Sequence, residues 1–176
     1  PGERAIEPMS ELAPAIAEAL AAHDEAHIRA LLANLQAPDL ADLIEFLEPP
    51  QRVALVESLG AAFDPEALSE LDEGVRDQLL ADLPQATVAK AVAELETDDA
   101  AYVLENLDAN QRREILAQIP SIDRAALERN LEYPEETAGR LMQTDFVAVP
   151  PFWTIGQVID HMREADDLPD TFSDIY

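Results

Sequence analysis

Apolar residues recur at an interval of twelve positions along most of the chain. This series is aliphatic throughout and consists of Leu35, Leu47, Leu59, Leu71, Leu83, Leu95, Leu107, Ile119 and Leu131. A second pair of residues stands four and three places before each member, from Leu31-Leu32 to Leu127-Glu128, and only Glu128 in these pairs is polar. Because positions i, i+1 and i+4 lie on one face of an α-helix, each unit carries a single apolar stripe.

Turn-forming residues separate these stripes at the same spacing. They are Pro38-Asp39, Pro49-Pro50, Asp64-Pro65, Glu73-Gly74, Pro84, Thr97-Asp98, Asn110, Pro120-Ser121 and Tyr133-Pro134. Proline and helix-capping residues end one helix and begin the next. The pattern therefore predicts a helix of two to three turns followed by a short turn, repeated nine times, with two consecutive units forming a hairpin. An arginine follows at the same offset in three units, at Arg52, Arg76 and Arg112.

Helices of this length must be stabilised by their neighbours, since isolated helices shorter than about 12 residues are marginal in water. Each stripe has to be buried against adjacent units, so contacts run from repeat to repeat. The predicted fold is all-α, a superhelical stack (α-solenoid) of short helical hairpins followed by an incomplete α/β fragment. Glu128 is expected where the stack ends or meets another module.

Four segments follow from the changes in pattern. Residues 1–24 are expected to form a leader, loose over 1–10, and a first helix with Pro14 in its opening turn. The helical repeat domain is assigned to 25–132, beginning with a helix from about Glu25 to Leu35, and 133–145 form a connector. Since the chain starts at Pro1, we expect it to be part of a longer protein.

The remaining segment, 146–176, has the texture of a cut α/β module. Phe146 to Val149 predicts a buried strand, Thr154 a cap for the next helix, and Ile175-Tyr176 the opening of another strand. The helix carries Ile155, Val158, Ile159 and Met162 on one face. An incomplete sheet has an open edge, so we expect this segment to be exposed, mobile or swapped onto a neighbouring molecule.

Charge and composition narrow the function. The net charge is −26, with a single lysine, Lys90. Such a surface repels nucleic acid and anionic membranes and attracts cations or basic protein surfaces. With 48% hydrophobic residues in a regular register, the acidic residues coat a real core. Cysteine is absent, and neither a glycine-rich phosphate loop nor a nucleophile–base pair is visible, so the sequence does not predict an enzyme.

Two other candidates are weaker. His23 and His27 stand one helical turn apart and could hold a transition metal, but the residues between them do not give the H-E-x-x-H order of a metalloprotease. A solvated helix start is the favoured interpretation. Trp153, next to Phe152, is expected to pack in the small module rather than bind a ligand.

The connector and the segment after it resemble the cytoplasmic part of the MgtE family of magnesium transporters. The residues that carry the resemblance are Tyr133, Glu135 or Glu136, Ala138-Gly139, Leu141-Met142 and the segment Phe146 to Val149. In that family such a connector joins a helical N domain to a pair of CBS domains. The resemblance identifies 25–132 as similar to the N domain and 146–176 as the start of the first CBS domain, with Thr154-Ile155 and Val158-Ile159 matching the CBS helix.

The resemblance implies a Mg²⁺-sensing regulatory region on the cytoplasmic side of the inner membrane. Such a region is itself soluble, belongs to a homodimer, and gates a pore in a transmembrane domain through Mg²⁺ bound at acidic interdomain surfaces. Its partners are Mg²⁺ and the CBS and transmembrane domains of the same protein, with no role for nucleic acid. Mg²⁺ suits this role because it is held by one or two carboxylates and retained waters.

By position in the repeats, the metal carboxylates of the family correspond to Glu66 and Asp98. Tyr102 stands where some members have a second acid, so the site either has fewer ligands or is moved to Asp99 or Glu105. The alternative is that these acids only favour helix N-termini, where the macrodipole attracts them.

Two other functions remain open at this stage. The flagellar switch protein FliG has similar hairpins, so the repeats could form a protein–protein scaffold. A CBS-containing regulator of an enzyme is a third possibility. Apolar spans downstream of a completed CBS pair would indicate the transporter, and further helical repeats would indicate the scaffold.

Overall fold

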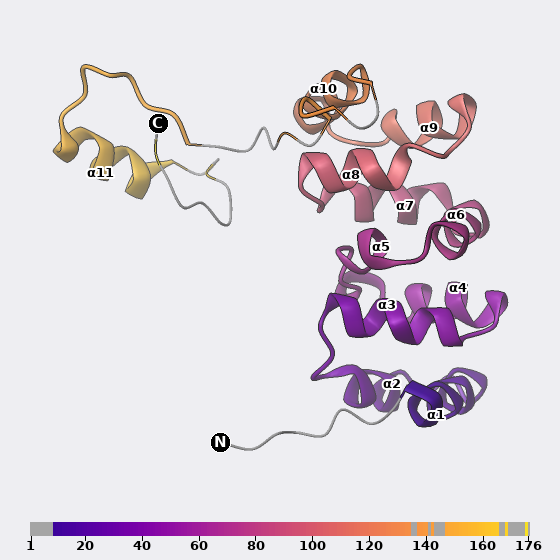
Figure 1. The fold of residues 1–176 in the computed structure, drawn as a ribbon. Helices are drawn as coiled ribbons and strands as arrows, with labels where there is room; N and C mark the ends of the chain where they lie inside the picture. Colours follow the sequence, from indigo (N-terminus) through magenta and orange to yellow (C-terminus); the bar gives the residue numbers. More distant parts are fainter. Residues whose placement is uncertain are drawn as a thin grey trace.

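The computed structural model describes residues 9–134, 137–140, 142, 147–165, 168 and 175. Helices make up its regular structure (Figure 1). Their bounds are α1 Met9–Ala21, α2 Glu25–Leu32, α3 Ala37–Phe46, α4 Pro49–Leu59, η1 (a 3₁₀ turn) Gly60–Ala62, α5 Ala67–Glu70, α6 Glu73–Asp82, α7 Gln85–Ala93, α8 Thr97–Leu104, α9 Ala109–Leu116, α10 Ser121–Leu131 and α11 Ile155–Glu164.

The twelve-residue spacing of the sequence is reproduced in the helix starts. α2 begins at Glu25 and α3 at Ala37, and the later helices keep the same interval up to Ser121 at the start of α10. One unit departs from the pattern. There Gly60, with a φ of 53°, ends α4, and the 3₁₀ turn and the short α5 replace a single helix. Glycine suits this position because a side chain is strained at positive φ.

The predicted apolar register forms the core. The residue pairs that stand four and three places before the members of the twelve-residue series are almost fully buried in the middle of the chain. Leu43-Ile44 and Val103-Leu104 are each 0% exposed. Six of the nine members of the twelve-residue series are buried, and Leu35, Leu95 and Leu131 are partly buried against the same core. Glu128 is exposed on α10, at the end of the stack. The stack of short helical hairpins is thus confirmed.

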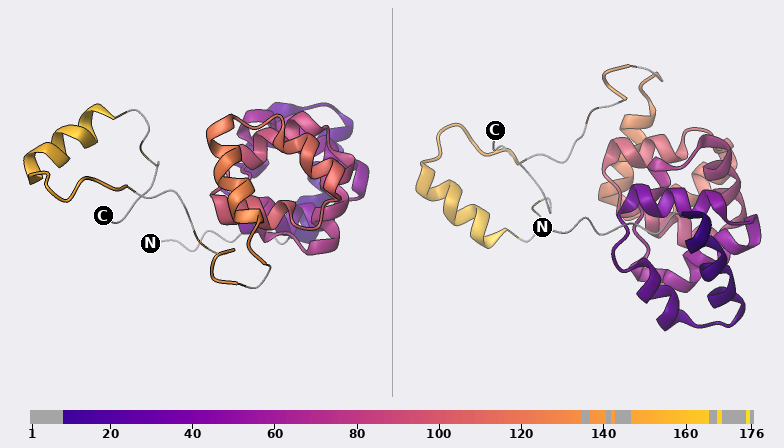
Figure 2. Two further views of the ribbon diagram at one scale, coloured as in Figure 1. Left: turned by 90° about the horizontal axis from the view of Figure 1, so that it is seen from above. Right: turned by 60° about the horizontal axis from the view of Figure 1, so that its bottom comes forward.

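Helices pack mainly on the helix two units away. α3 contacts α5, α4 contacts α6, α7 contacts α9, and α8 contacts α10. The stack rises from α1 and α2 to α9 and α10 (Figure 1), and viewed along its axis the helices follow one another around a ring (Figure 2). This winding brings α5 against α8, three units later. No helix in the described part of the chain is long and apolar enough to cross a membrane.

The repeated arginines close the turns between units, with one exception. Arg52 donates from Nε to the carbonyl oxygens of Ile44 (3.0 Å) and Leu47 (2.8 Å), at the end of α3. Arg112 donates from Nη2 to Glu105 O and Leu107 O in the same way. These bonds satisfy carbonyls that a helix end leaves without partners. Arg76 makes no such bond, and its three guanidinium nitrogens are buried without hydrogen-bond partners in the described structure.

Three sequence predictions need correction. α1 begins at Met9, so Pro14 lies in its second turn and not in its opening turn. α2 ends at Leu32, three residues before the expected end at Leu35, because the chain turns there toward α3.

The third correction concerns the predicted strand Phe146 to Val149. No strand is formed among the described residues, where Val147 makes one isolated parallel bridge with Ile175. Phe146 and Tyr176 lie outside the described residues, as do residues 1–8 of the leader. A sheet needs several paired strands to be stable, and this segment carries only the beginnings of two.

The capped helix of this segment is confirmed as α11, with Thr154 as its N-cap. Its apolar side is largely exposed, since Ile155 is 80% and Ile159 44% accessible. α11 is drawn apart from the stack in Figure 1. Val147, by contrast, is only 4% exposed, so the expectation for the segment as a whole stays a prediction. The CBS assignment of 146–176 stays a prediction.

Candidate metal centre

The acidic residues proposed as metal ligands come from two helices that pack together. Glu66 is the N-cap residue of α5 and is exposed, while Asp98 and Asp99 lie in the first turn of α8 and are half-buried. Because α5 packs on α8, residues about thirty positions apart in the sequence share one face. The bottom of α8 and the short α5 meet in the middle of the stack (Figure 1).

The pKa of Asp99 reflects the electrostatics of this face. Burial raises the pKa of Asp99 above its usual value, and the negative charges of Asp98, Glu96, Glu66 and Glu70 raise it further. Each of these carboxylates thus lies near enough to disfavour ionisation of Asp99. We use the name acidic face for these five residues. Repulsion between these carboxylates raises the free energy of the folded chain, and a bound cation reduces that repulsion.

Two members of the acidic face were missed by sequence reasoning. Glu70 stands four residues after Glu66, and Glu96 is the N-cap residue of α8. The spacing of Glu70 from Glu66 corresponds to one helical turn and could have suggested it. Glu96 stands three residues before Asp99 at the start of the same helix, a spacing that could also have suggested it.

Asp98 differs from its neighbours. Its Oδ1 atom is buried and has no hydrogen-bond partner in the part of the chain that the structure describes. A buried carboxylate oxygen normally accepts a hydrogen bond or binds a cation. Among the described residues, however, no group of three or more metal-ligating side chains is arranged to hold an ion. The acidic face is at most part of a site, and its remaining ligands would be waters or groups of another module.

Tyr102, the departure from the acidic pattern, has its own partner. The guanidinium carbon of the fully buried Arg76 lies 4.2 Å from the centre of its ring. A cation placed over an aromatic face is stabilised by the ring quadrupole. The position therefore serves a contact between α6 and α8 and supplies no carboxylate to the face.

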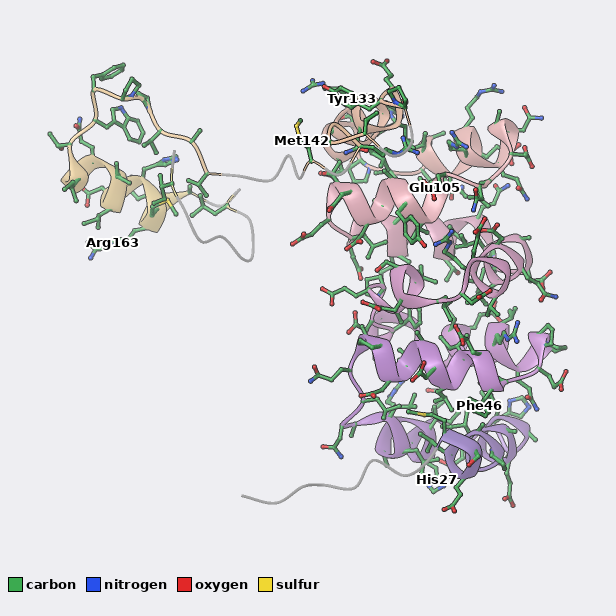
Figure 3. The ribbon with its side chains drawn as sticks, in the orientation of Figure 1. His27, Phe46, Glu105, Tyr133, Met142 and Arg163 are labelled. Carbon is green, nitrogen blue, oxygen red and sulfur yellow. The ribbon has the colours of Figure 1, made fainter. Side chains whose placement is uncertain are left out.

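Glu105 does not join the acidic face either. It follows the last residue of α8, seven positions after Asp98, which corresponds to about 10 Å along a helix. Its Oε2 lies 3.9 Å from Nη2 of Arg140. Figure 3 shows Glu105 at the same end of the stack as Tyr133 and Met142 of the connector. This position for a ligand, raised as an alternative by the sequence, is not supported by the structure.

The two histidines are placed at a solvated helix start, the interpretation favoured from the sequence. His23 and His27 are both exposed, and the backbone N–H of His27 donates to Oδ1 of Asp24, the cap of α2. Trp153 is half-buried and contacts His161 edge-on, with ring centroids 5.2 Å apart.

The raised pKa of Asp99 makes stability depend on pH. Between the unfolded value, near 3.8, and the higher folded value, the folded chain holds more protons than the unfolded chain, so this residue reduces stability as pH rises through that interval. We expect Asp99→Asn to raise the free energy of unfolding at neutral pH without divalent ions, and the gain to disappear as pH falls toward 3.8. Urea unfolding at a series of pH values measures this. Asp42→Asn, an exposed change within α3, is the control and should show a smaller gain.

The fold and the acidic face define a class of protein, a helical-repeat domain with an acidic surface. The comparison with known families is specific. The family model described as the MgtE intracellular N domain matches residues 35–136, more than half of the chain. The chain belongs to this family.

Known proteins agree with the assignment. The chain is 20% identical over 148 residues to the magnesium transporter MgtE of Bacillus subtilis (strain 168), covering 84% of this chain and 33% of the relative. It thus spans about a third of that protein's length. The crystal structure of the soluble part of a magnesium transporter matches 96% of this chain and 67% of its own, with 23% identity and a TM-score of 0.73. The cytosolic domain of the Mg²⁺ channel MgtE in complex with ATP matches 93% and 67%, with 27% identity and a TM-score of 0.74.

Proposed function

We propose that this chain is the cytoplasmic, Mg²⁺-sensing regulatory region of an MgtE-type magnesium transporter. In this proposal it performs no catalysis. Mg²⁺ bound at the acidic face, with Glu66, Asp98 and Asp99 as ligands, favours a closed pore formed by a transmembrane domain outside this sequence. The full-length protein acts as a homodimer. Family membership supports the transporter over the scaffold of the flagellar type, because the matching proteins are magnesium transporters and channels.

The observation that carries the proposal is the buried Oδ1 atom of Asp98, which has no hydrogen-bond partner among the described residues, on a helix that packs against α5 and its Glu66. The raised pKa of Asp99 beside four other carboxylates supports it. Charges held this close repel one another and also repel any acidic module that approaches them. Mg²⁺ is a hard cation that binds carboxylate oxygens and keeps several waters, so one or two carboxylates from each side are sufficient. The incomplete ligand set on this chain fits a site shared between modules.

Linkage explains how such a site would act as a sensor. A ligand that binds the associated arrangement of two modules more tightly than the separated one shifts the population toward association. At low Mg²⁺, the acidic face would hold the modules apart by repulsion. At high Mg²⁺, the ions would join them, and the connector after Tyr133 would transmit the change.

Calorimetric titration with MgCl₂ tests the proposal on the chain extended through both CBS domains. We expect binding in the millimolar range or tighter, and we expect Glu66→Ala with Asp98→Ala to weaken it by about tenfold or more, since charged ligands contribute strongly. The matched control is Asp42→Ala with Glu57→Ala, which removes two exposed acids from α3 and α4. Absence of binding at millimolar Mg²⁺, or equal weakening in both variants, would refute the assignment of the site.

A further inference from the structure

Three arginines line a groove between α9 and α10, in a protein whose surface is mostly acidic. The chain has 11 basic residues against 37 acidic ones. The groove has a volume of about 360 Å³, and its lining includes Arg112, Arg113 and Leu116 from α9 with Arg124 and Glu128 from α10. We call it the arginine groove. The lining therefore holds three arginines and one glutamate in a protein whose net charge is −26.

The charges of these arginines are poorly neutralised. Arg113 is exposed, donates from Nη1 to Oδ1 of Asn110 at 3.3 Å, and forms no ion pair within the described structure. Nε of Arg124 lies 4.0 Å from Oε1 of Glu128, the outer limit of an ion pair, and both side chains are partly exposed, at 38% and 57%. Neither arginine is closely paired with a carboxylate, although the protein has carboxylates in excess, so both guanidinium groups can bind a ligand.

Arg112 adds a half-buried cation to the lining of the groove. Its Nη2 donates to two backbone carbonyls, which holds the guanidinium plane in place. Its Nε is buried and has no hydrogen-bond partner among the described residues. A fixed guanidinium keeps its orientation when a ligand binds, so little side-chain entropy is lost.

We propose that the arginine groove binds a polyvalent phosphate anion from solution. Guanidinium groups match phosphate oxygens in pairs of hydrogen bonds. The volume lies within the range of small-molecule sites, and the groove is open to solvent, so an ion can enter it directly. Glu128 already supplies one negative charge, so a ligand has to carry more charge than a carboxylate to displace it. This site is separate from the acidic face and does not depend on Mg²⁺ binding.

Two other occupants fit less well. An anionic bilayer would be repelled by the charge of −26 before its headgroups reached the groove. An acidic protein surface would meet the same repulsion over a larger area, whereas a small ion needs only the local field of the three arginines.

The test is a calorimetric titration of the 176-residue chain with sodium tripolyphosphate, at an ionic strength of about 0.15 M and without divalent ions. Charges more than about 8 Å away are largely screened under this condition, so the local field of the groove decides binding. We expect saturable binding of one ion per chain. Arg113→Gln and Arg124→Gln should each weaken it by about tenfold, as expected for loss of a charge-assisted contact. Glu128→Gln should strengthen it by about threefold, because a competing carboxylate is removed. Amide exchange in the presence of the ion should slow in α9 and α10.

A matched pair of substitutions separates the groove from overall charge. Arg29→Gln with Arg163→Gln changes two exposed arginines on α2 and α11, and it should leave the affinity within about twofold. The proposal is overturned if tripolyphosphate does not bind at millimolar concentration, if this control weakens binding as much as Arg113→Gln with Arg124→Gln, or if Glu128→Gln weakens it. Co-sedimentation with vesicles of anionic phospholipid, lost in the groove variants, would overturn the assignment to a free anion.

Discussion

Leu104→Ala is expected to lower the free energy of unfolding by about 2–5 kcal/mol, the range measured for large-to-small changes at fully buried positions. Leu104 is 0% exposed and is the last residue of α8. That helix packs on α5, α7 and α10, so the cavity would open where four helices meet. Urea unfolding followed by circular dichroism measures the change, with the midpoint shifted and the slope retained.

The control for this prediction is Leu131→Ala. Leu131 is a member of the twelve-residue series but is only partly buried, at the end of α10. Leu131 buries less apolar surface than Leu104, and its truncation leaves a smaller cavity. The free energy of unfolding should therefore fall by under half of the loss for Leu104→Ala. Equal losses would mean that the register alone, without burial in the middle of the stack, sets the contribution of a leucine.

Much of the fold was predictable because its determinants are local. The interval of twelve residues, the turn formers and the apolar stripes each depend on neighbours in sequence, and they correctly indicated short helices in series. New helices begin at or beside the turn formers Pro38, Pro84 and Pro120. Caps were equally local, since Asp72 and Asp108 accept from the backbone N–H groups two residues later. Stacking then follows, because each stripe can be buried only by its neighbours.

Features that depend on the rotation between units were not predictable. Arg52, Arg76 and Arg112 hold the same place in the sequence pattern, yet Arg76 stacks on Tyr102 instead of binding carbonyls. The reason is that α5, the helix before it, is a single turn and α8 approaches from three units later. The same approach brings Glu66 and Glu70 of α5 to the aspartates of α8.

The candidate site was therefore predictable in part. The family resemblance indicated Glu66 and Asp98, and the structure places them on neighbouring helices, but their role as Mg²⁺ ligands remains a proposal. The strand at Phe146 to Val149 illustrates the opposite limit. Its sequence has the composition of a strand, yet a strand depends on partners, and the described residues offer Val147 only one bridge.

The second prediction concerns the residues that join the connector to the stack. Arg140 is 7% exposed and donates from Nη1 to Asn130 O at 3.3 Å, with Nη2 3.9 Å from Oε2 of Glu105. Asn130 in turn donates from Nδ2 to the carbonyl oxygen of Met142 at 3.2 Å. The connector is thus held at both α8 and α10, and α8 is also the helix that carries Asp98 of the acidic face.

Arg140→Ala is expected to lower the free energy of unfolding by about 2–4 kcal/mol, because it removes buried packing and leaves Glu105 without its cation. Urea unfolding measures this loss, and amide exchange should become faster at residue 140, whose N–H donates to Thr137 O. The control, Arg163→Ala, removes an exposed arginine 4.0 Å from Asp160 and should change stability by less than about 0.5 kcal/mol.

A second substitution tests the same junction from its other side. A Cβ atom at Gly139 would lie 2.5 Å from Cδ1 of Tyr133, so Gly139→Ala must displace that ring. Because Tyr133 is 41% exposed, the ring can move outward, and we expect a smaller loss than for Arg140→Ala but the same faster exchange at residue 140. If Arg140→Ala left both stability and exchange unchanged, the connector would not be fixed to α8, and movement at the acidic face could not reach it through this ion pair.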